Sequence, residues 1–274
     1  MLHPRVEYLA VYLGLAMLGP LFSWLERRGV GADRGPFFTA ARRLDLVWWL
    51  VTPLFTGTVA RILLLGIVAI VARVAGFGAD GNGFLARIQG MLPFARLPWP
   101  VAFVLALVVA DFFAYSSHRL RHTAALWRVH AVHHAAEDLT ALTAARLHPL
   151  DEIVDTILIG VPVLLLGFPL SVFAALGPFF VLHTLMIHAR VSWTFGPLGR
   201  VFASPRFHRR HHARGLPAAN FGGVLSLYDV IFGTFEMPAV DPVEMGIDER
   251  DVPESLFAQL AYPFRRLAAM ARGS

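Results

Sequence analysis

The chain has 274 residues, of which 56% are hydrophobic and only 16% are charged. Soluble globular domains carry about 25% charged residues, so this composition indicates that much of the surface faces lipid rather than water. The absence of cysteine excludes disulfides, thiolate metal sites and cysteine nucleophiles, and a net charge of +5 in so apolar a chain fits anionic lipid head groups better than nucleic acid, which is not an expected partner.

Four apolar runs are candidates for membrane spans. In chain order they are residues 8–24, 46–71, 99–117 and 153–188, the last broken in its middle by Gly167-Phe168-Pro169. About 20 apolar residues cross a bilayer as a helix, and the break predicts a helical hairpin whose ends return to one side. Arg61, inside the second run, must pair or reach the membrane surface. The expected fold is an all-α integral membrane protein with about four transmembrane helices, the hairpin included, and a cytoplasmic helical cap.

Basic residues predict the sidedness. The arginine-rich loop after the first run marks the cytoplasmic side; its arginines are Arg27, Arg28, Arg34, Arg42 and Arg43. Counting spans forward places His118 to the hairpin, and Arg190 onward, on this side as well. Every histidine cluster then faces the cytoplasm, and an alanine- and arginine-rich chain suggests a bacterial inner membrane. The first run has no basic start and no small-residue cleavage site, so a signal peptide is not expected.

The histidines are concentrated in one part of the chain. Eleven of the twelve lie between His118 and His212, and eight of these form one pair and two triplets. The clusters are His118-x-x-x-His122, His130-x-x-His133-His134 and His208-x-x-His211-His212. On a helix the two members of the pair share a face. In each triplet the first and third histidine share a face and the second points about 100° away, so that one turn can supply ligands to two metal ions.

Eight imidazoles exceed the three or four ligands of a single zinc ion and therefore imply two metal ions. Two ions in a cysteine-free, all-nitrogen site suit iron, which can activate dioxygen, whereas zinc has no redox chemistry. His183 and His188, near the end of the second hairpin arm, are further candidate ligands, because ionisable residues at the end of an apolar helix mark function. Their five-residue spacing fits one face only if a π-bulge intervenes. His148, on a loop, either supports a ligand or caps a helix, and His3 is not expected to take part.

These motifs resemble those of the fatty acid hydroxylase/sterol desaturase superfamily of membrane di-iron enzymes. The resemblance rests on DFFAYSSHRLRH, LWRVHAVHHAAEDLTALTAARLHP, IHAR, SPRFHRRHH and NFGGVLSLYDVIFGTFE, and it covers roughly residues 99–236. It implies two iron ions held by the histidine boxes, O2 as co-substrate, and hydroxylation or desaturation of a lipid. It also implies a separate electron donor of ferredoxin or cytochrome type with its reductase, since no haem-binding domain is expected within this chain.

The resemblance also implies roles for individual residues. The implied metal ligands are His118, His122, His130, His133, His134, His188, His208, His211 and His212, to which His183 is added as a tenth candidate. Asn220 and Asp229 match the N-x-G and W-D-x-x-F-G-T elements of the family, with Tyr228 in place of the usual tryptophan. Arg190 stands where many relatives have asparagine. Asp229 is expected either to orient a ligand imidazole or to serve as a helix cap or surface ion pair. The residues expected behind the ligands are Asp111, Tyr115, His148, Asn220 and Asp229.

Three parts are expected along the chain. Residues 1–98 form an N-terminal transmembrane region with two spans, residues 99–239 a core with the histidine boxes and the hairpin, and residues 240–274 a cytoplasmic tail. In this tail, residues 256–270 with Arg265, Arg266 and Arg272 predict an amphipathic helix on the membrane surface.

The predicted function is O2-dependent hydroxylation or desaturation of a lipid by a membrane monooxygenase or desaturase. One alternative is a di-zinc membrane hydrolase acting on a lipid, which would use the same histidines without oxygen, although no H-E-x-x-H motif supports it. A haem protein would place single histidines on facing helices, and a metal transporter would need ionisable residues through several spans. The sequence does not identify the lipid.

Overall fold

The structure of the protein is a computed structural model that describes residues 16–28, 39–77, 83–84, 87, 93–242, 244–248 and 252–271. Within these ranges the regular elements are helices, apart from one isolated bridge between Ala213 and Met245. The all-α prediction is therefore confirmed. His3, Arg34, Arg272 and the start of the first apolar run lie outside the described residues, and the expectations that rest on them, including the one about a signal peptide, stay predictions.

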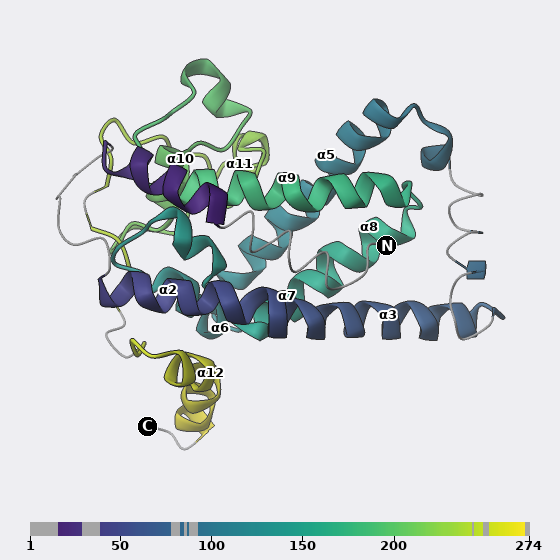
Figure 1. Cartoon of the computed structure of the whole chain (residues 1–274), viewed down its shortest axis with the longest axis horizontal. Helices are drawn as coiled ribbons and strands as arrows, with labels where there is room; N and C mark the ends of the chain where they lie inside the picture. Colours follow the sequence, from purple (N-terminus) through teal and green to yellow (C-terminus); the bar gives the residue numbers. More distant parts are fainter. Residues whose placement is uncertain are drawn as a thin grey trace.

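Three stretches of helix are long and apolar enough to cross a membrane. The first joins α2 (Ala40–Val51), the π turn η1 (Thr52–Thr56) and α3 (Gly57–Val74) into 35 residues, and the others are α5 (Trp99–Arg121) and α9 (Leu170–His188). In Figure 1 these helices extend toward one end of the molecule, and the shorter helices α6 (Trp127–His134) and α10 (Pro205–His211) lie toward the other. The long helices thus run from the cap, which carries the histidine triplets, toward the other end of the molecule.

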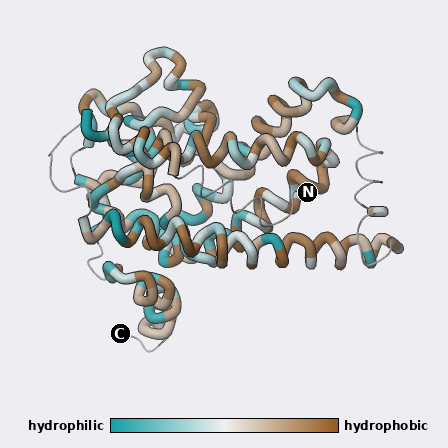
Figure 2. The backbone as a smooth tube through the Cα atoms, viewed as in Figure 1, coloured by the Kyte–Doolittle hydropathy of each residue, from teal (hydrophilic) through white to brown (hydrophobic). Residues whose placement is uncertain are grey.

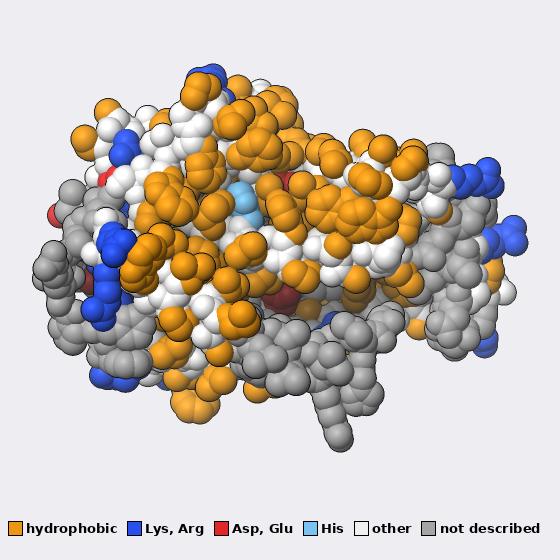
Figure 3. All heavy atoms as spheres, turned by 45° about the horizontal axis from the view of Figure 1, so that its top comes forward, with side chains coloured by type: hydrophobic (Ala, Val, Ile, Leu, Met, Phe, Trp, Pro, Cys, Tyr) orange, Lys and Arg blue, Asp and Glu red, His pale blue; other side chains and the backbone are white. Residues whose placement is uncertain are grey.

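The long helices keep many apolar side chains on the outside of the protein. Ile62 and Ile70 of α3 are each 66% exposed, and hydrophobic residues follow one another along α3 and α9 (Figure 2). Hydrophobic side chains also cover much of the face drawn in Figure 3. So large an exposed apolar surface is costly in water and is typical of a surface that contacts lipid.

The predicted hairpin is present. Its first arm consists of α7 (Pro149–Asp155), the π turn η4 (Thr156–Gly160) and α8 (Val161–Leu165), and α9 is the second arm. The chain turns at Gly167, whose φ of +74° is accessible to glycine without steric cost, and Pro169 caps the start of α9. The first arm is too short to join the three candidate spans of the described chain. Four membrane crossings therefore remain a prediction.

Small residues let α5 pack closely against the hairpin. Ala102, Ala106 and Ala110 recur every fourth residue and are buried against Phe168 and neighbouring apolar side chains of α8 and α9. Because residues four apart share a helix face, this spacing gives α5 one smooth side, and small side chains allow membrane helices to approach one another. Close packing of this kind holds the ends of α5 and α9 in fixed positions beside the cap.

The cap is joined to α2 by buried polar contacts. Arg146 forms a buried ion pair with Asp45 (Nε–Oδ1 2.8 Å), and the Trp49 indole donates to the Leu142 carbonyl (2.9 Å). The remaining elements are short except for the last: η2 (Pro93–Arg96), η3 (Ala141–Ala145), η5 (Gly196–Arg200), α11 (Leu227–Phe232) and α12 (Leu256–Ala271). Arg61, the charge inside the second apolar run, donates to the Gly57 carbonyl of its own helix (3.2 Å), and its pairing with a charge or its reach to the membrane surface stays a prediction.

Candidate metal centre

Four helix ends bring the histidines together. His118 lies in the last turn of α5 and His122 caps that helix, and His188 is the last residue of α9. The two triplets belong to α6 and to the end of α10. The short helix α10 begins where the Ser204 hydroxyl accepts from the Phe207 N–H (3.4 Å) and where Pro205 follows, a serine cap and an N1 proline that favour helix initiation.

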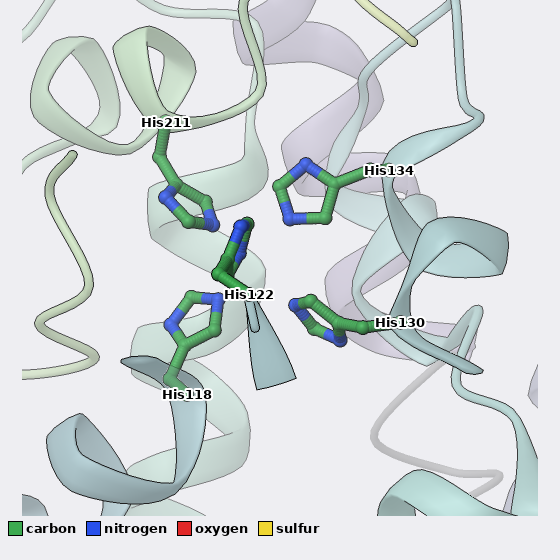
Figure 4. Close-up of side chains that lie close together, drawn as sticks. All are labelled: His118, His122, His130, His134 and His211. Atoms are coloured by element: carbon green, nitrogen blue, oxygen red, sulfur yellow. The ribbon is translucent and has the colours of Figure 1, made fainter. Parts of the chain in front are cut away.

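Nine of the predicted ligands form two groups of buried or nearly buried imidazoles. Within each group, one ring nitrogen of every residue lies within 4.8 Å of the others. The first group is His118, His122, His130, His134 and His211, and the second is His133, His188, His208 and His212. Figure 4 shows the five rings of the first group converging on a common centre from separate segments of the chain. Each group has enough nitrogen donors to hold one metal ion.

Each triplet contributes to both groups: α6 supplies two histidines to the first group and one to the second, and α10 supplies one to the first and two to the second. From α6, the first and third histidines (His130 and His134) enter the first group and His133 enters the second. From α10, His208 and His212 enter the second group and His211 enters the first. This division follows the rotation of about 100° per residue in a helix, and it places the imidazoles of one helical turn in two groups.

The ring nitrogens are spaced as metal ligands are. In the second group, Nε2 of His188 lies 3.2 Å from Nε2 of His133 and 3.1 Å from Nε2 of His208. A metal ion bound at about 2.0–2.1 Å in a tetrahedral site separates its nitrogen ligands by about 3.3–3.4 Å. In the first group the Nε2 atoms of all five imidazoles are buried without a hydrogen-bond partner in the described part of the chain. Unpaired buried nitrogens cost about 1–3 kcal/mol each, and a metal ion satisfies them together, so the residues present fit metal ions.

Backbone carbonyls fix the orientation of four of these rings. The Nδ1 atoms donate to Phe221 O from His118 (2.8 Å), to Ala219 O from His211 (2.7 Å), to Arg146 O from His133 (3.1 Å) and to Thr184 O from His188 (2.7 Å). A carbonyl that accepts from Nδ1 selects the tautomer whose Nε2 carries the free lone pair. In each of these residues the lone pair is therefore available to the shared centre.

Burial keeps the histidines of the cap neutral. Desolvation is the main cause that lowers the pKa of the cap histidines well below the usual value, and neighbouring imidazoles lower it further, with a contribution from Arg121 at His130 and His133. The residues with this shift are His130, His133, His134, His208, His211 and His212. Desolvation also lowers the pKa of His122, to about 3. Neutral imidazole is the form that binds a metal ion.

Comparison with known proteins agrees with this geometry. Residues 103–234 match the family model of the fatty acid hydroxylases. An ornithine lipid hydroxylase of Rhizobium tropici is 39% identical over 174 residues, which are 61% of this chain and 52% of that protein. Residues 103–234 are thus similar to the fatty acid hydroxylase family. Human alkylglycerol monooxygenase is 37% identical over 146 residues (52% of this chain, 32% of that protein), and a Gibberella zeae Delta(7)-sterol 5(6)-desaturase is 28% identical over 154 residues (56% and 41%).

The superfamily resemblance seen in the sequence is thereby confirmed. No solved structure matches this chain. The chain spans about half of the ornithine lipid hydroxylase and about a third of alkylglycerol monooxygenase. The matched region of the fatty acid hydroxylase family contains all nine grouped histidines, so family membership and the geometry of the centre concern the same residues.

In this matched region, Asp229 binds a loop and does not contact an imidazole directly. Its carboxylate oxygens accept from the backbone N–H groups of Phe221 and Gly222 (both 2.7 Å) and from the Thr234 hydroxyl (2.7 Å). The loop lies between α11 and the imidazole of His118, so the expected orienting role of Asp229 stays a prediction and would be indirect. Asp229 is linked to His118 through the Phe221–Gly222 peptide. The N–H of this peptide donates to Asp229, and its carbonyl accepts from Nδ1 of His118. At Gly222 a Cβ atom would lie 2.8 Å from the carboxylate, so this approach requires glycine.

Asn220 secures the same loop between two ligands. Its backbone adopts a φ of +62°, which asparagine tolerates better than most residues. The side-chain amide donates to the carbonyls of Phe207 (2.8 Å) and Glu236 (2.6 Å), and its oxygen accepts from the Glu236 N–H (2.7 Å). The neighbouring residues, Ala219 and Phe221, carry the carbonyls that bind His211 and His118. Asn220 is thus behind two imidazoles of the first group, as expected, without contacting either ring.

Asp111 and Tyr115 support this loop from α5. The Asp111 carboxylate accepts from the N–H groups of Val224 (2.9 Å) and Leu225 (2.7 Å). The Tyr115 hydroxyl lies 3.0 Å from the Thr234 hydroxyl, which in turn donates to Asp229. Both residues therefore lie behind the ligands, but their hydrogen bonds reach the backbone and the Asp229 network rather than an imidazole.

Two histidines that the sequence suggested for the site, His148 and His183, belong to neither of the two imidazole groups found in the described residues. His148 caps α7, because its Nδ1 accepts from the Leu150 N–H (3.1 Å) while its Nε2 donates to the Leu260 carbonyl (3.0 Å). Of its two expected roles, the structure supports the cap. His183 is absent from both groups. The α-helix α9 continues through this region without a π turn, so five residues rotate His183 by about 140° from His188.

One carboxylate beside a ligand was missed in the sequence. Asp151 lies with its Oδ1 3.3 Å from Nδ1 of His130 and 3.5 Å from Nη1 of Arg121. Burial raises the pKa of Asp151 to about 7, and the Arg121 guanidinium opposes this rise. The sequence feature that could have indicated Asp151 is its position two residues after Pro149, in the first turn of a helix. A carboxylate behind a ligand imidazole orients the ring and raises its basicity.

Proposed function

We propose that this chain is an O2-dependent membrane oxidoreductase that hydroxylates or desaturates a lipid at a di-iron centre. The observation that carries the proposal is the pair of imidazole groups, five in one and four in the other, within a fatty acid hydroxylase domain. The relatives are named for ornithine lipid hydroxylation, alkylglycerol monooxygenation and sterol desaturation. These names share oxidation of a lipid, which supports the same reaction class here.

In this proposal one iron binds each group of histidines. The ligands of the first ion are His118, His122, His130, His134 and His211, and those of the second are His133, His188, His208 and His212. When bound, the two irons supply the activation of dioxygen. The protein holds the imidazoles neutral and correctly oriented, because carbonyls anchor the Nδ1 atoms and the cap excludes water from the centre.

The Phe221 ring is the apolar contact between the first group and the membrane helices. Its centroid lies 5.9 Å from that of His118, 5.2 Å from that of His122 and 5.7 Å from that of His211. Phe221 also belongs to an apolar cluster with Tyr115, against which Phe179 and Phe180 of α9 pack. We propose that the lipid chain approaches the first group along this cluster, since hydrophobic side chains bind an acyl or sterol carbon skeleton without a polar penalty.

The proposal also includes the side of the membrane that the cap faces and the redox partners of the metal centre. Arg42 and Arg43 lie at the start of α2, the end of the first long stretch nearest the cap in Figure 1. By the positive-inside rule, this supports a cytoplasmic cap, and the alanine- and arginine-rich composition supports a bacterial inner membrane. As the resemblance to membrane di-iron enzymes implies, a separate ferredoxin- or cytochrome-type donor with its reductase is proposed to deliver electrons to the cap.

Metal analysis tests the proposal. We expect the protein, purified in detergent from cells grown on iron-57, to contain about two irons per chain and to give ferrous Mössbauer signals that change on exposure to oxygen. The His211→Ala variant should lose iron, whereas His183→Ala, at a histidine outside both groups, should keep it. Stoichiometric zinc from iron-replete cells, with no oxygen uptake on any lipid extract, would overturn the proposal in favour of a di-zinc hydrolase.

A further inference from the structure

Helix α12 packs against the cap along one side only. Gln259 is 1% exposed and accepts from the Trp48 indole (2.8 Å), and Tyr262 is buried beside it. The Leu260 carbonyl accepts from His148, the residue that caps α7. This side of α12 faces α6, which carries the first histidine triplet, and α2. The helix is therefore fixed to the metal-bearing cap by both apolar and polar contacts.

A second side of α12 presents large apolar side chains to the exterior. Phe257 is 83% exposed, Phe264 56% and Leu267 52%. At about 100° per residue these three side chains lie within about 80° of one another around the helix. The sequence of α12, LFAQLAYPFRRLAAMA, has no acidic residue and contains Arg265 and Arg266. We call Phe257, Phe264 and Leu267 the outer stripe.

Two observations identify a lipid surface as the partner of the outer stripe. First, α12 contacts α2, the start of the 35-residue stretch that is able to cross a membrane. Figure 1 shows α12 beside α2, at the cap end of that stretch rather than along α3. Val47 and Leu50 of α2 are themselves exposed apolar residues. Second, aromatic side chains flanked by arginine and free of acidic residues match the boundary between anionic head groups and acyl chains.

We propose that α12 is an interfacial helix that inserts the outer stripe into the membrane boundary while its other side holds the cap. The inference rests on the membrane placement contained in the proposed function. Contact with lipid on one side and with α6 on the other fixes the height of the histidine triplet above the bilayer. The outer stripe thus sets how far the metal-bearing cap stands from the lipid that it receives.

Single-cysteine labelling tests this inference directly, because the chain has no cysteine of its own. A bimane label is placed at Phe257→Cys, Phe264→Cys or Leu267→Cys in the full chain, reconstituted in vesicles of phosphatidylcholine and phosphatidylglycerol. Brominated phosphatidylcholine quenches labels that reach the acyl region. Ile62→Cys, on the exposed side of α3, is the positive control. Arg265→Cys is the matched control, because this exposed position lies beyond the edge of the outer stripe, about 100° around α12 from Phe264 and about 160° from Leu267. Iron content confirms that each labelled variant is folded.

We expect quenching at all three stripe positions to be at least half of that at Ile62 and at least twice that at Arg265. Quenching at Ile62 with none above the Arg265 level in the stripe overturns the inference but leaves the membrane placement intact. Absence of quenching at Ile62 overturns both. Disulfide-linked dimers of the unlabelled Phe257→Cys variant, together with little lipid quenching of its labelled form, also overturn the inference and assign the stripe to a second copy of the chain.

Discussion

Replacement of Asn220 by alanine tests whether the loop at residues 219–223 holds the first group of ligands. The change removes three side-chain hydrogen bonds and leaves the Phe207 carbonyl and both backbone groups of Glu236 without their partner. Each net hydrogen bond is worth about 0.5–1.5 kcal/mol. The φ of +62° adds about 1 kcal/mol of strain for a residue with a Cβ and no polar side chain. The expected destabilisation of Asn220→Ala is about 3–5 kcal/mol.

Asn220→Asp is the sharper comparison because it preserves size and tolerance of positive φ. The aspartate still accepts from the Glu236 N–H, but it cannot donate to two carbonyls that now face a carboxylate. A role in filling space alone would leave Asn220→Asp close to wild type, whereas the hydrogen-bonding role predicts that it is as unstable as Asn220→Ala. Leu216→Ala, at an exposed side chain of the preceding segment, is the control and should change stability by less than about 0.5 kcal/mol.

The assay is thermal unfolding of the detergent-purified holoprotein combined with metal analysis. A loss of 3–5 kcal/mol corresponds to a fall in Tm of about 10 °C for a chain of this size. Because His118 and His211 lose their anchored carbonyls, the first group should release its metal to a chelator more readily than the second. A Tm within 2 °C of wild type for both Asn220 variants, with unchanged metal release, would refute the reasoning.

Three further predictions concern the metal groups. Asp151→Asn removes the carboxylate beside His130 and should weaken metal binding in the first group about 10–100-fold, measured by chelator competition; unchanged affinity would exclude Asp151 as a positioning residue. His188→Ala should remove one metal of the two and His183→Ala neither, and equal metal loss in both variants would contradict the assignment of His183 outside the groups. In the metal-free chain, burial lowers the pKa of the cap histidines in the folded state below the unfolded value of about 6.5. Below pH 6.5 the unfolded chain therefore binds protons that the folded chain does not bind. The free energy of unfolding is highest above pH 6.5 and decreases as the pH falls below this value. Tm measured from pH 8 to pH 5.5 should therefore decrease, and a flat profile would refute this.

The sequence alone determined the features that depend on fixed helical geometry. The division of each triplet between two centres follows from the rotation per residue, which is nearly the same in every α-helix. Gly167 and Pro169 predicted the hairpin break because their backbone restrictions are local. Ligand counting predicted two metal ions from composition and spacing, and the histidines form two groups. These conclusions required no knowledge of which helices are neighbours.

The tertiary structure decided which imidazoles meet and what stands behind them. His122 and His211 share a group because the ends of α5 and α10 converge, and no local spacing relates two residues so far apart. Asp229 reaches His118 only through the loop peptide that separates them, and Asp151 reaches His130 only because α7 packs beside α6. Such contacts depend on the relative positions of helices, which are set by packing over the whole core and not by the periodicity of any one segment.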